Sequence, residues 1–247
     1  MPEANFDAAA ADYDRESGLQ QEIAAHLCQL LEIVAPPSLV LDVGCGTGGL
    51  CGQLLRRFPA AKFDLLDASP AMLAIAQARL RQLRPEASPQ LFRSVDELPG
   101  ERSYDLIVSS MALQWFDDLP GALVRLQRQL APGCLLAFAL PLDGSLAPFI
   151  DAFETCGLPY PGLRYPPAEA LLRMLPPGSR CCTVGWTQKF PDTLAFVRHL
   201  HRLGAVRRDA PRLPSAELRR VCAAGDRMKI AGQIEIPWSI GFFQAPA

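Results

Sequence analysis

A glycine turn between a buried strand and a helix constrains the fold of this 247-residue chain more than any other feature. The apolar run at residues 39–43 predicts a buried parallel strand, and Gly44, Gly46 and Gly48 follow it directly. Glycine tolerates positive φ and has no Cβ, so a ligand can lie against bare backbone at Gly44 or Gly46. We therefore expect a ligand site at this turn, in space that a Cβ at either position would fill.

The spacing of the glycines distinguishes this turn from two common phosphate-binding turns. It reads G-x-G-x-G, whereas dinucleotide enzymes carry G-x-G-x-x-G, and it lacks the G-K-[ST] ending of a triphosphate loop. Asp42, two residues before the first glycine, suits a cationic amino group and would repel a pyrophosphate. Asp67, which ends the strand expected at 62–67, can accept both hydroxyls of a ribose. The alternative is that both acids only cap strand ends and the glycines only make a turn.

The rest of the chain continues an alternation of strands and helices. Further strands are expected at 90–93, 104–109, 134–140, 183–190 and 234–243, and helices at 19–32, after the turn to 57, from Ser69-Pro70, and at 120–130, 192–203 and 215–223. Prolines and glycines interrupt this rhythm between 142 and 180, where two short helical patches are expected. The pattern predicts a doubly wound α/β fold with a mostly parallel seven-stranded sheet and a helical insertion after the fifth strand.

Composition excludes several classes of function. The 24 Lys and Arg against 26 Asp and Glu give a net charge of −2, without the basic excess of a nucleic-acid-binding protein. The eight cysteines form no C-x-x-C pair and there are three histidines, so we expect neither a disulfide framework nor a metal site. The chain shows no signal peptide pattern and no apolar stretch long enough to span a bilayer, so we expect a cytoplasmic protein.

Four segments carry a resemblance to known enzymes. The run D-V-G-C-G-T-G at 42–48 resembles the first motif of class I S-adenosylmethionine (SAM) dependent methyltransferases. Residues 6–14, residues 69–74 and above all S-S-M-A-L-Q-W-F at 109–116 resemble the malonyl-acyl-carrier-protein O-methyltransferases of biotin synthesis. That family methylates the free carboxylate of a malonyl thioester. Trans-aconitate methyltransferases share the A-L-Q-W and S-P-A-M stretches, so the motifs indicate carboxylate methylation more firmly than they identify the acid.

The resemblance implies that SAM is the cofactor, that the glycines pass its methionine part and that Asp67 holds its ribose. Family members usually carry an acid where this chain has Ser94, so either Ser94 contacts the adenine amine or Asp96 substitutes for that acid. The expected cofactor-binding residues are Asp42, Gly44, Cys45, Gly46, Asp67, Ala68, Met72, Ser94, Val95, Asp96 and Ser109.

Methylation of a carboxylate places few demands on catalytic side chains. With a pKa near 4, a carboxylate is ionised at neutral pH and needs no general base, so positioning and desolvation are the expected contributions. We expect Tyr13 to close over the methyl donor, and Gln114 and Trp115 to line the same cavity beyond the fourth strand. For Tyr13 and Trp115, ordinary packing is the alternative.

The resemblance also divides the chain into parts. Residues 1–35 are expected to form a helical segment that closes over the cofactor. Residues 36–141 and 182–247 would form the SAM-binding domain, and residues 142–181 would act as a lid over the substrate.

A cluster of arginines indicates how an acidic carrier protein bearing the malonyl group would dock. Arg198, Arg202, Arg207, Arg208 and Arg212 fall within fifteen residues that contain one acid. A solvated helix face explains the cluster equally well, and one of these arginines is an alternative partner for the substrate carboxylate. Two other functions stay open: a methyltransferase for a small natural product, and a SAM-binding regulator or partner subunit without transferase activity.

Overall fold

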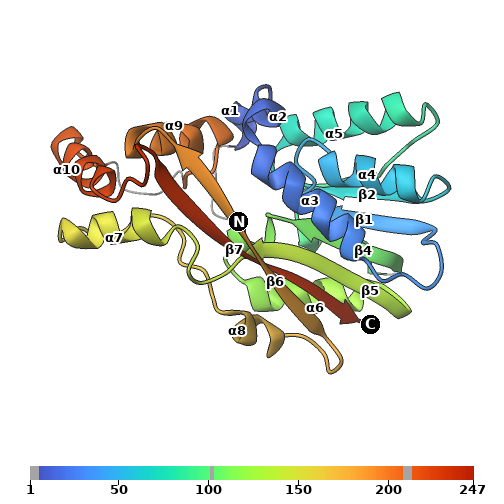
Figure 1. The fold of residues 1–247 in the computed structure, drawn as a ribbon. Coiled ribbons are helices and arrows are strands. Elements are labelled where there is room, and N and C mark those ends of the chain that lie inside the picture. The colour runs from blue at the N-terminus through green and yellow to red at the C-terminus, as the bar shows by residue number, and fades with distance from the viewer. Residues whose placement is uncertain (1–5, 101–102, 208–212) are drawn as a thin grey trace.

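The computed structural model describes residues 6–100, 103–207 and 213–247. Its strands form one sheet in the order β3-β2-β1-β4-β5-β7-β6 (Figure 1). The first five strands pair in parallel, whereas β7 pairs antiparallel with both β5 and β6. The strands are β1 (Leu39–Val43), β2 (Lys62–Leu66), β3 (Leu91–Phe92), β4 (Tyr104–Ser110), β5 (Leu130–Pro141), β6 (Arg180–Phe190) and β7 (Ile234–Pro246). The expected doubly wound, mostly parallel seven-stranded sheet is confirmed.

Successive side chains of a strand point to opposite faces, so each strand supplies two cores. In β4, Leu106 and Val108 join one core with residues of α3 (Gly18–Leu30), α4 (Gly49–Arg57) and α5 (Pro70–Leu83). Ile107 joins the other, with α6 (Leu119–Arg128) and α8 (Ala168–Leu172). Because both faces are covered, the central strands read as continuous apolar runs.

Local signals fix the starts of two helices where the sequence predicts them. The Ser69 hydroxyl accepts the backbone N–H of Met72 at 3.1 Å, and Pro70 opens α5. The Asp192 carboxylate accepts the N–H of Ala195 at 2.7 Å and caps α9 (Thr193–Leu203). Gly204, with φ of 76°, ends α9 in the left-handed region.

The largest departures from the expected boundaries lie in the antiparallel part of the sheet. β5 begins at Leu130, β6 at Arg180 and β7 runs to Pro246, each longer than expected. These extensions come from pairing between strands: Gln244, for instance, lies opposite both Ala137 and Arg180. Such pairing brings polar residues into a strand without a local signal.

Helices near the carboxyl ends of the parallel strands frame the site. Two four-residue helices, α1 (Phe6–Ala9) and α2 (Tyr13–Glu16), lie between α5 and α9 at the top of Figure 1. The insertion after β5 contains α7 (Ala147–Thr155) and α8, and α7 packs against α10 (Ser215–Asp226) and β7. Within the described residues, no helix is both long and apolar enough to cross a membrane.

Candidate functional site

The glycine turn between β1 and α4 is held against the end of β2. The N–H groups of Gly44 and Cys45 donate to the carbonyl of Leu66 at 2.6 and 3.0 Å, and the N–H of Gly46 donates to the Asp67 carboxylate at 2.9 Å. Gly44, Gly46 and Gly48 have φ of 67°, 53° and 83°. All three therefore occupy a region that favours glycine.

Gly44 and Gly46 are required for different reasons, although the sequence suggested room for a ligand at both. A Cβ at Gly44 would overlap the Cβ of Ala112 in the segment after β4. Close packing, and not only room for a ligand, therefore requires Gly44. At Gly46 the nearest atom to an added Cβ would be Cε1 of Tyr13, 3.9 Å away, an ordinary van der Waals contact, so no neighbouring side chain crowds this position. Bare backbone for a ligand is thus offered mainly at Gly46.

Asp67 stabilises the turn through hydrogen bonds and also lines the turn cavity as a hydrogen-bond acceptor. Its Oδ2 accepts the N–H of Gly46 and its Oδ1 accepts the N–H of Ser69, each at 2.9 Å. Burial raises the pKa of Asp67 above its ordinary value, and these two hydrogen bonds oppose the rise. A carboxylate has about four lone-pair sites, so two remain for a ligand. The capping and ribose-binding interpretations are therefore compatible.

Asp42 is buried at the end of β1, with 1% of its surface exposed. Its Oδ2 accepts the N–H of Cys51 in the first turn of α4 at 3.1 Å. Burial raises the pKa of Asp42 to about 7, and the charge of Asp67 adds to the rise. A cationic group nearby would stabilise the ionised form, which fits the role expected from the sequence.

Two cavities are lined by residues of the turn, and a third shares Tyr13 with both of them. The turn cavity, about 620 Å³, runs from the glycines past the end of β2 and is lined by Gly44, Gly46, Asp67, Ala68, Met72, Ser94, Val95, Asp96, Ser110 and Trp115, among others. The polar pocket, about 370 Å³, lies on the α3 side and is lined by Asp42, Gly44, Cys45, Gly46, Gln20 and Ser110, among others. The apolar cavity, about 700 Å³, lies between the insertion, α9 and the segment after β4.

The structure brings the expected cofactor residues together with one exception. Ser109 lines none of the three cavities: it is fully buried and its hydroxyl donates to the carbonyl of Val43 at 2.8 Å. The next residue, Ser110, lines the turn cavity and the polar pocket instead. Alternation along β4 explains the difference of one residue.

Ser94 and Asp96 lie at the same end of the turn cavity. The Ser94 hydroxyl accepts the N–H of Asp96 at 3.2 Å and lies 3.3 Å from Oδ2 of Asp96. The other carboxylate oxygen of Asp96 pairs with Arg125 of α6. Both side chains are therefore placed to meet a ligand there.

Aromatic side chains separate the turn cavity from the apolar cavity. Tyr13 lines all three cavities, whereas Phe6 and Trp115 line both the turn cavity and the apolar cavity. The rings of Phe6 and Trp115 meet edge to face with centroids 5.4 Å apart. Met111 lies at the same boundary in a left-handed conformation (φ 55°), which a non-glycine residue rarely adopts.

Gln114 faces the apolar cavity next to this boundary. Its Nε2 donates to the carbonyl of Met111 at 2.9 Å. Its Oε1 is buried and has no hydrogen-bond partner among the residues described. An unpaired buried amide oxygen is costly and is consistent with a site completed by a ligand.

Tyr13 is unsuited to act as a base. Burial raises the pKa of its hydroxyl well above the ordinary value, and the charges of Asp67 and Asp14 add to the rise. The phenol therefore stays protonated at neutral pH and is available as a hydrogen-bond donor.

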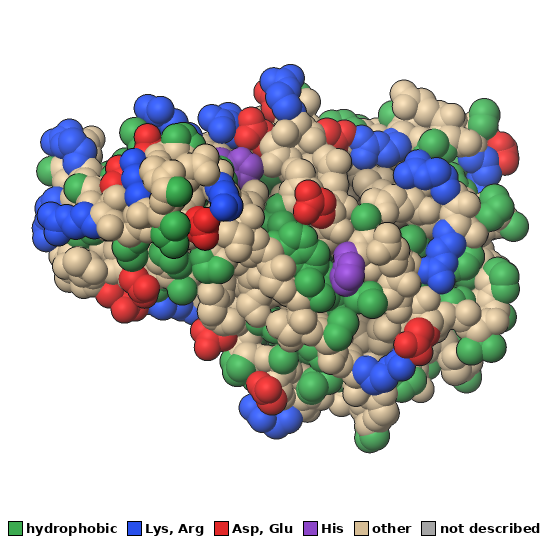
Figure 2. All heavy atoms as spheres, in the orientation of Figure 1, with side chains coloured by type: hydrophobic (Ala, Val, Ile, Leu, Met, Phe, Trp, Pro, Cys, Tyr) green, Lys and Arg blue, Asp and Glu red, His purple; other side chains and the backbone are tan. Residues whose placement is uncertain are grey.

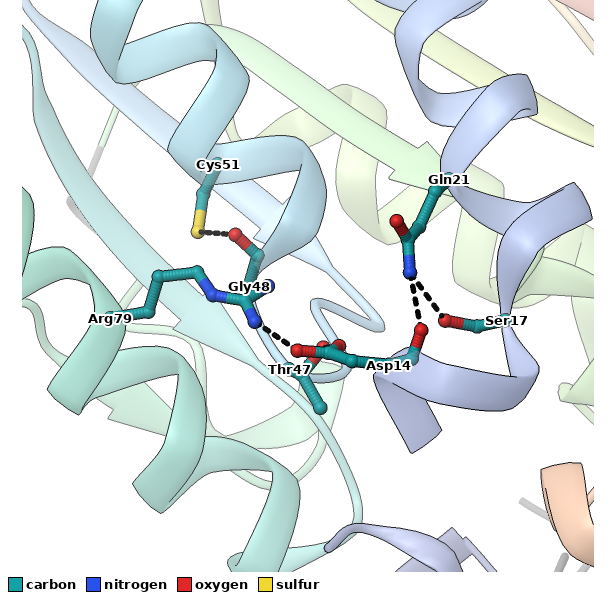
Figure 3. Close-up of polar contacts among 7 residues, drawn as sticks. All are labelled: Asp14, Ser17, Gln21, Thr47, Gly48, Cys51 and Arg79. Carbon is teal, nitrogen blue, oxygen red and sulfur yellow. Dashed lines mark hydrogen bonds and ion pairs between the residues drawn. The ribbon is translucent and has the colours of Figure 1, made fainter. Parts of the chain in front are cut away.

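Asp14 fastens the N-terminal segment to the turn (Figure 3). One of its carboxylate oxygens accepts the hydroxyl of Thr47 at 2.6 Å, and the other pairs with Arg79 of α5. Its carbonyl accepts Nε2 of Gln21 at 2.8 Å. Asp14 was not among the expected site residues, although it ends the 6–14 segment that carried the resemblance.

The turn cavity and polar pocket fit SAM on several counts. Gly46 leaves bare backbone, and Asp42 and Asp67 stand at the ends of adjacent strands. The Oγ of Ser110 and the Oε1 of Gln20 are buried without partners among the described residues, and both residues line the polar pocket. Across that same part of the chain, no group of three or more His, Cys, Asp or Glu side chains could hold a metal ion.

Comparison with known proteins decides the family. A family model described as a methyltransferase domain matches residues 41–136. The malonyl-[acyl-carrier protein] O-methyltransferase of Magnetococcus marinus is 33% identical over 217 residues, which cover 87% of this chain and 78% of that protein. Its counterpart in Methylococcus capsulatus is 32% identical over 242 residues, covering 91% and 84%.

This chain belongs to the malonyl-[acyl-carrier protein] O-methyltransferase family. The resemblance read from the sequence is confirmed, and with it a SAM-dependent methyltransferase. The biotin biosynthesis bifunctional protein BioCD of Bordetella avium is 36% identical over 231 residues, or 90% of this chain. The present chain spans about half the length of that bifunctional protein, since the match covers 48% of it.

Solved structures agree on the fold. Phosphoethanolamine N-methyltransferase 2 of Haemonchus contortus, in complex with SAM, superposes with a TM-score of 0.60 at 15% identity. The superposition covers 97% of the present chain and 57% of the Haemonchus chain. The N-methyltransferase NodS of Bradyrhizobium japonicum, in complex with S-adenosylhomocysteine (SAH), gives a TM-score of 0.53 at 15% identity, covering 98% and 100%. At these identities the likeness concerns the fold alone.

The packing of Gly44 predicts a second-site rescue. Gly44→Ala should lower the free energy of unfolding by about 2–4 kcal/mol, because a left-handed alanine costs about 1–2 kcal/mol and its Cβ overlaps Ala112. Adding Ala112→Gly should restore part of this loss. Urea unfolding of the two variants tests the pair. A double variant no more stable than Gly44→Ala would show that Ala112 is not the obstacle.

The raised pKa of Asp42 predicts how stability varies with pH. Between about pH 4 and 7 the folded state holds a proton on Asp42 that the unfolded state has released, so this residue lowers stability as pH rises. The slope is at most about 1.4 kcal/mol per pH unit. Asp42→Asn keeps an acceptor for Cys51 but does not titrate. Its stability relative to the unmodified protein should therefore increase from pH 4 to 7 and then level off; a constant difference across this range would contradict the assignment.

Proposed function

We propose that this methyltransferase methylates the free carboxylate of a malonyl thioester carried by an acyl-carrier protein, the reaction that the names of its relatives describe. The observation that carries the proposal is the apolar cavity, which meets the turn cavity at Phe6, Tyr13 and Trp115. An acceptor in the apolar cavity would reach a methyl donor in the turn cavity across this boundary.

The lining of the apolar cavity favours a thioester over a free polyacid. Aromatic and aliphatic side chains dominate it, including Phe149, Phe153, Tyr160, Tyr165 and Trp238. His201 and Arg207 are the basic side chains among its described lining residues. A tricarboxylate such as trans-aconitate would require several cations, because buried charges must be paired. A malonyl thioester brings one carboxylate, and its thioester group is uncharged.

We assign residues to parts of SAM by the hydrogen-bonding groups and charges that their side chains provide. We assign Asp67 to the ribose hydroxyls, Asp42 to the amino group of the methionine part, and Ser94 or Asp96 to the adenine amine. Ala68, Met72 and Val95 line the same cavity and supply packing surface. Gly44, Cys45 and Gly46 supply the backbone along which the methionine part passes.

Catalysis by these residues consists of orientation and exclusion of water. When bound, SAM supplies a methyl group, whose bond to sulfur breaks as the acceptor oxygen bonds to its carbon. Tyr13 keeps its proton and donates a hydrogen bond to the acceptor carboxylate, and Gln114 orients that carboxylate from the apolar side. Trp115 and Phe6 close the boundary to water, which strengthens the polar contacts within.

The chain's parts fit this arrangement. Within residues 1–35, the described residues Phe6, Asp7 and Tyr13 line the turn cavity, which supports a role for this segment as a cofactor lid. Residues 142–181 supply α7 and the segment at 160–165 to the wall of the apolar cavity, which supports a substrate lid.

The arginines of the cluster at 198–212 differ in their surroundings. Arg202 is paired with Glu16 at 2.9 Å, Arg207 lines the apolar cavity, and Arg208 and Arg212 lie outside the described residues. Arg198 is exposed on α9. Figure 2 shows Lys and Arg side chains around α9 and α10 with acidic side chains among them, so this face is mixed in charge. We propose that Arg198, together with Arg208, contributes to docking of the carrier protein.

A direct assay tests the reaction and the acceptor together. Incubation with SAM and malonyl-acyl-carrier protein should yield the methyl ester, detected by mass spectrometry, whereas trans-aconitate should be a poor acceptor. At saturating SAM the rate should be nearly constant from about pH 6 to 9, because the acceptor is already ionised, Tyr13 stays protonated and the cationic amino group of SAM keeps Asp42 ionised. Methylation of trans-aconitate without methylation of the carrier-bound acid would overturn the proposal.

A further inference from the structure

Three carboxylates tie the N-terminal segment to the rest of the molecule, and they point in two directions. Asp7 accepts the hydroxyl of Ser69 at 2.7 Å at the start of α5, and Asp14 accepts the hydroxyl of Thr47 at the glycine turn. Both contacts lie on the cofactor side. Glu16, at the end of α2, instead contacts α9.

Two side chains of α9 hold Glu16. Its Oε1 accepts Nε–H of Arg202 at 2.9 Å, and its Oε2 lies 3.2 Å from Nδ1 of His199. The side chains of Glu16 and His199 are 17% and 11% exposed, so most of this contact is shielded from water. Burial alone would raise the pKa of Glu16, but the hydrogen bonds and charges of Arg202 and His199 bring it below its ordinary value. Glu16 is therefore ionised at neutral pH.

The helix that receives Glu16 is also a wall of the apolar cavity. Val197, Leu200 and Leu203 of α9 line that cavity. Tyr13, one helical turn before Glu16, lines both the apolar cavity and the turn cavity. Glu16, His199 and Arg202 line none of the three cavities, so they act on a ligand only through their neighbours.

We propose that Glu16, held by His199 and Arg202, is a positioning residue that couples the two ligand sites. By joining α2 to α9 it fixes the wall of the apolar cavity relative to Tyr13, so that the acceptor carboxylate meets the methyl donor in one orientation. The identity of the acceptor rests on the proposed function; the link between the two helices does not.

The coupling is tested with Glu16→Gln, Arg202→Ala and the double variant. Arg180→Ala is the matched control, because Arg180 is as exposed as Arg202 (57% against 56%) and also pairs with a glutamate, Glu32, at 2.7 Å, but on the edge strand β6. Each single variant should lower kcat/KM for malonyl-acyl-carrier protein about tenfold while the Kd of SAH changes less than about threefold. The double variant should be no worse than either single variant. Arg180→Ala should match the unmodified protein.

A docking role for Arg202 predicts a different pattern. If Arg202 only attracted the carrier, Glu16→Gln would leave kcat/KM unchanged or raise it, which would overturn the coupling. A loss of SAH affinity in proportion to kcat/KM would also overturn it, because Glu16 would then serve the cofactor alone.

A second measurement needs no acceptor. Trypsin cleaves after Arg15, whose side chain is 78% exposed in α2. With SAH bound, release of the peptide ending at Arg15 should be several-fold faster in Arg202→Ala than in the unmodified protein or Arg180→Ala. Unchanged cleavage would refute the link between α2 and α9. If cleavage is faster in Arg202→Ala but the unmodified protein does not methylate malonyl-acyl-carrier protein, the link between α2 and α9 stands and the proposed acceptor is wrong.

Discussion

The hydrogen bonds that tie the glycine turn to the end of β2 are the constraint on which the site depends. Leu66 and Asp67 together accept three N–H groups from Gly44, Cys45 and Gly46, so the turn cannot take its left-handed course unless β1 and β2 pair in parallel and end together. The same carboxylate that holds the turn faces the cavity. If Asp67 holds the ribose as proposed, cofactor recognition is built into the junction of two strands and needs no separate loop.

The N-terminal segment completes what the sheet begins. Its two short helices are too small to be stable alone, since isolated helices of this length do not form in water. They are held by Asp7, Asp14 and Glu16, and they place Phe6 and Tyr13 at the boundary between the two ligand cavities. A hydroxyl kept protonated by burial and neighbouring carboxylates is suited to orient an ionised acceptor, which itself needs no base.

Sequence patterns predicted the parallel part of the fold well, because buried strands and capped helices carry local signals, as in residues 39–43 and at Ser69. They located the glycine turn, Asp42, Asp67 and Trp115 in the cavities, but misjudged features set by tertiary packing. Ser109 was expected at the cofactor, yet alternation along β4 turns its hydroxyl to the carbonyl of Val43, and Ser110 lines the turn cavity and the polar pocket. The contact of Gly44 with Ala112 joins segments far apart in the chain, and Asp14 and Glu16 acquire partners only when the helices assemble.

The proposed contact between Asp67 and the ribose of the cofactor can be measured directly. Calorimetry with SAH and with its 2′,3′-dideoxyribose analogue isolates this contact, because the effect of Asp67→Ala on the turn affects both ligands alike. The unmodified protein should bind SAH about ten- to a hundredfold more tightly than the analogue, as expected for hydrogen bonds to a charged group worth about 1.5–3 kcal/mol. Asp67→Ala should bind the two ligands almost equally. If this variant keeps the full preference for SAH, Asp67 is a strut for the turn and does not hold the ribose.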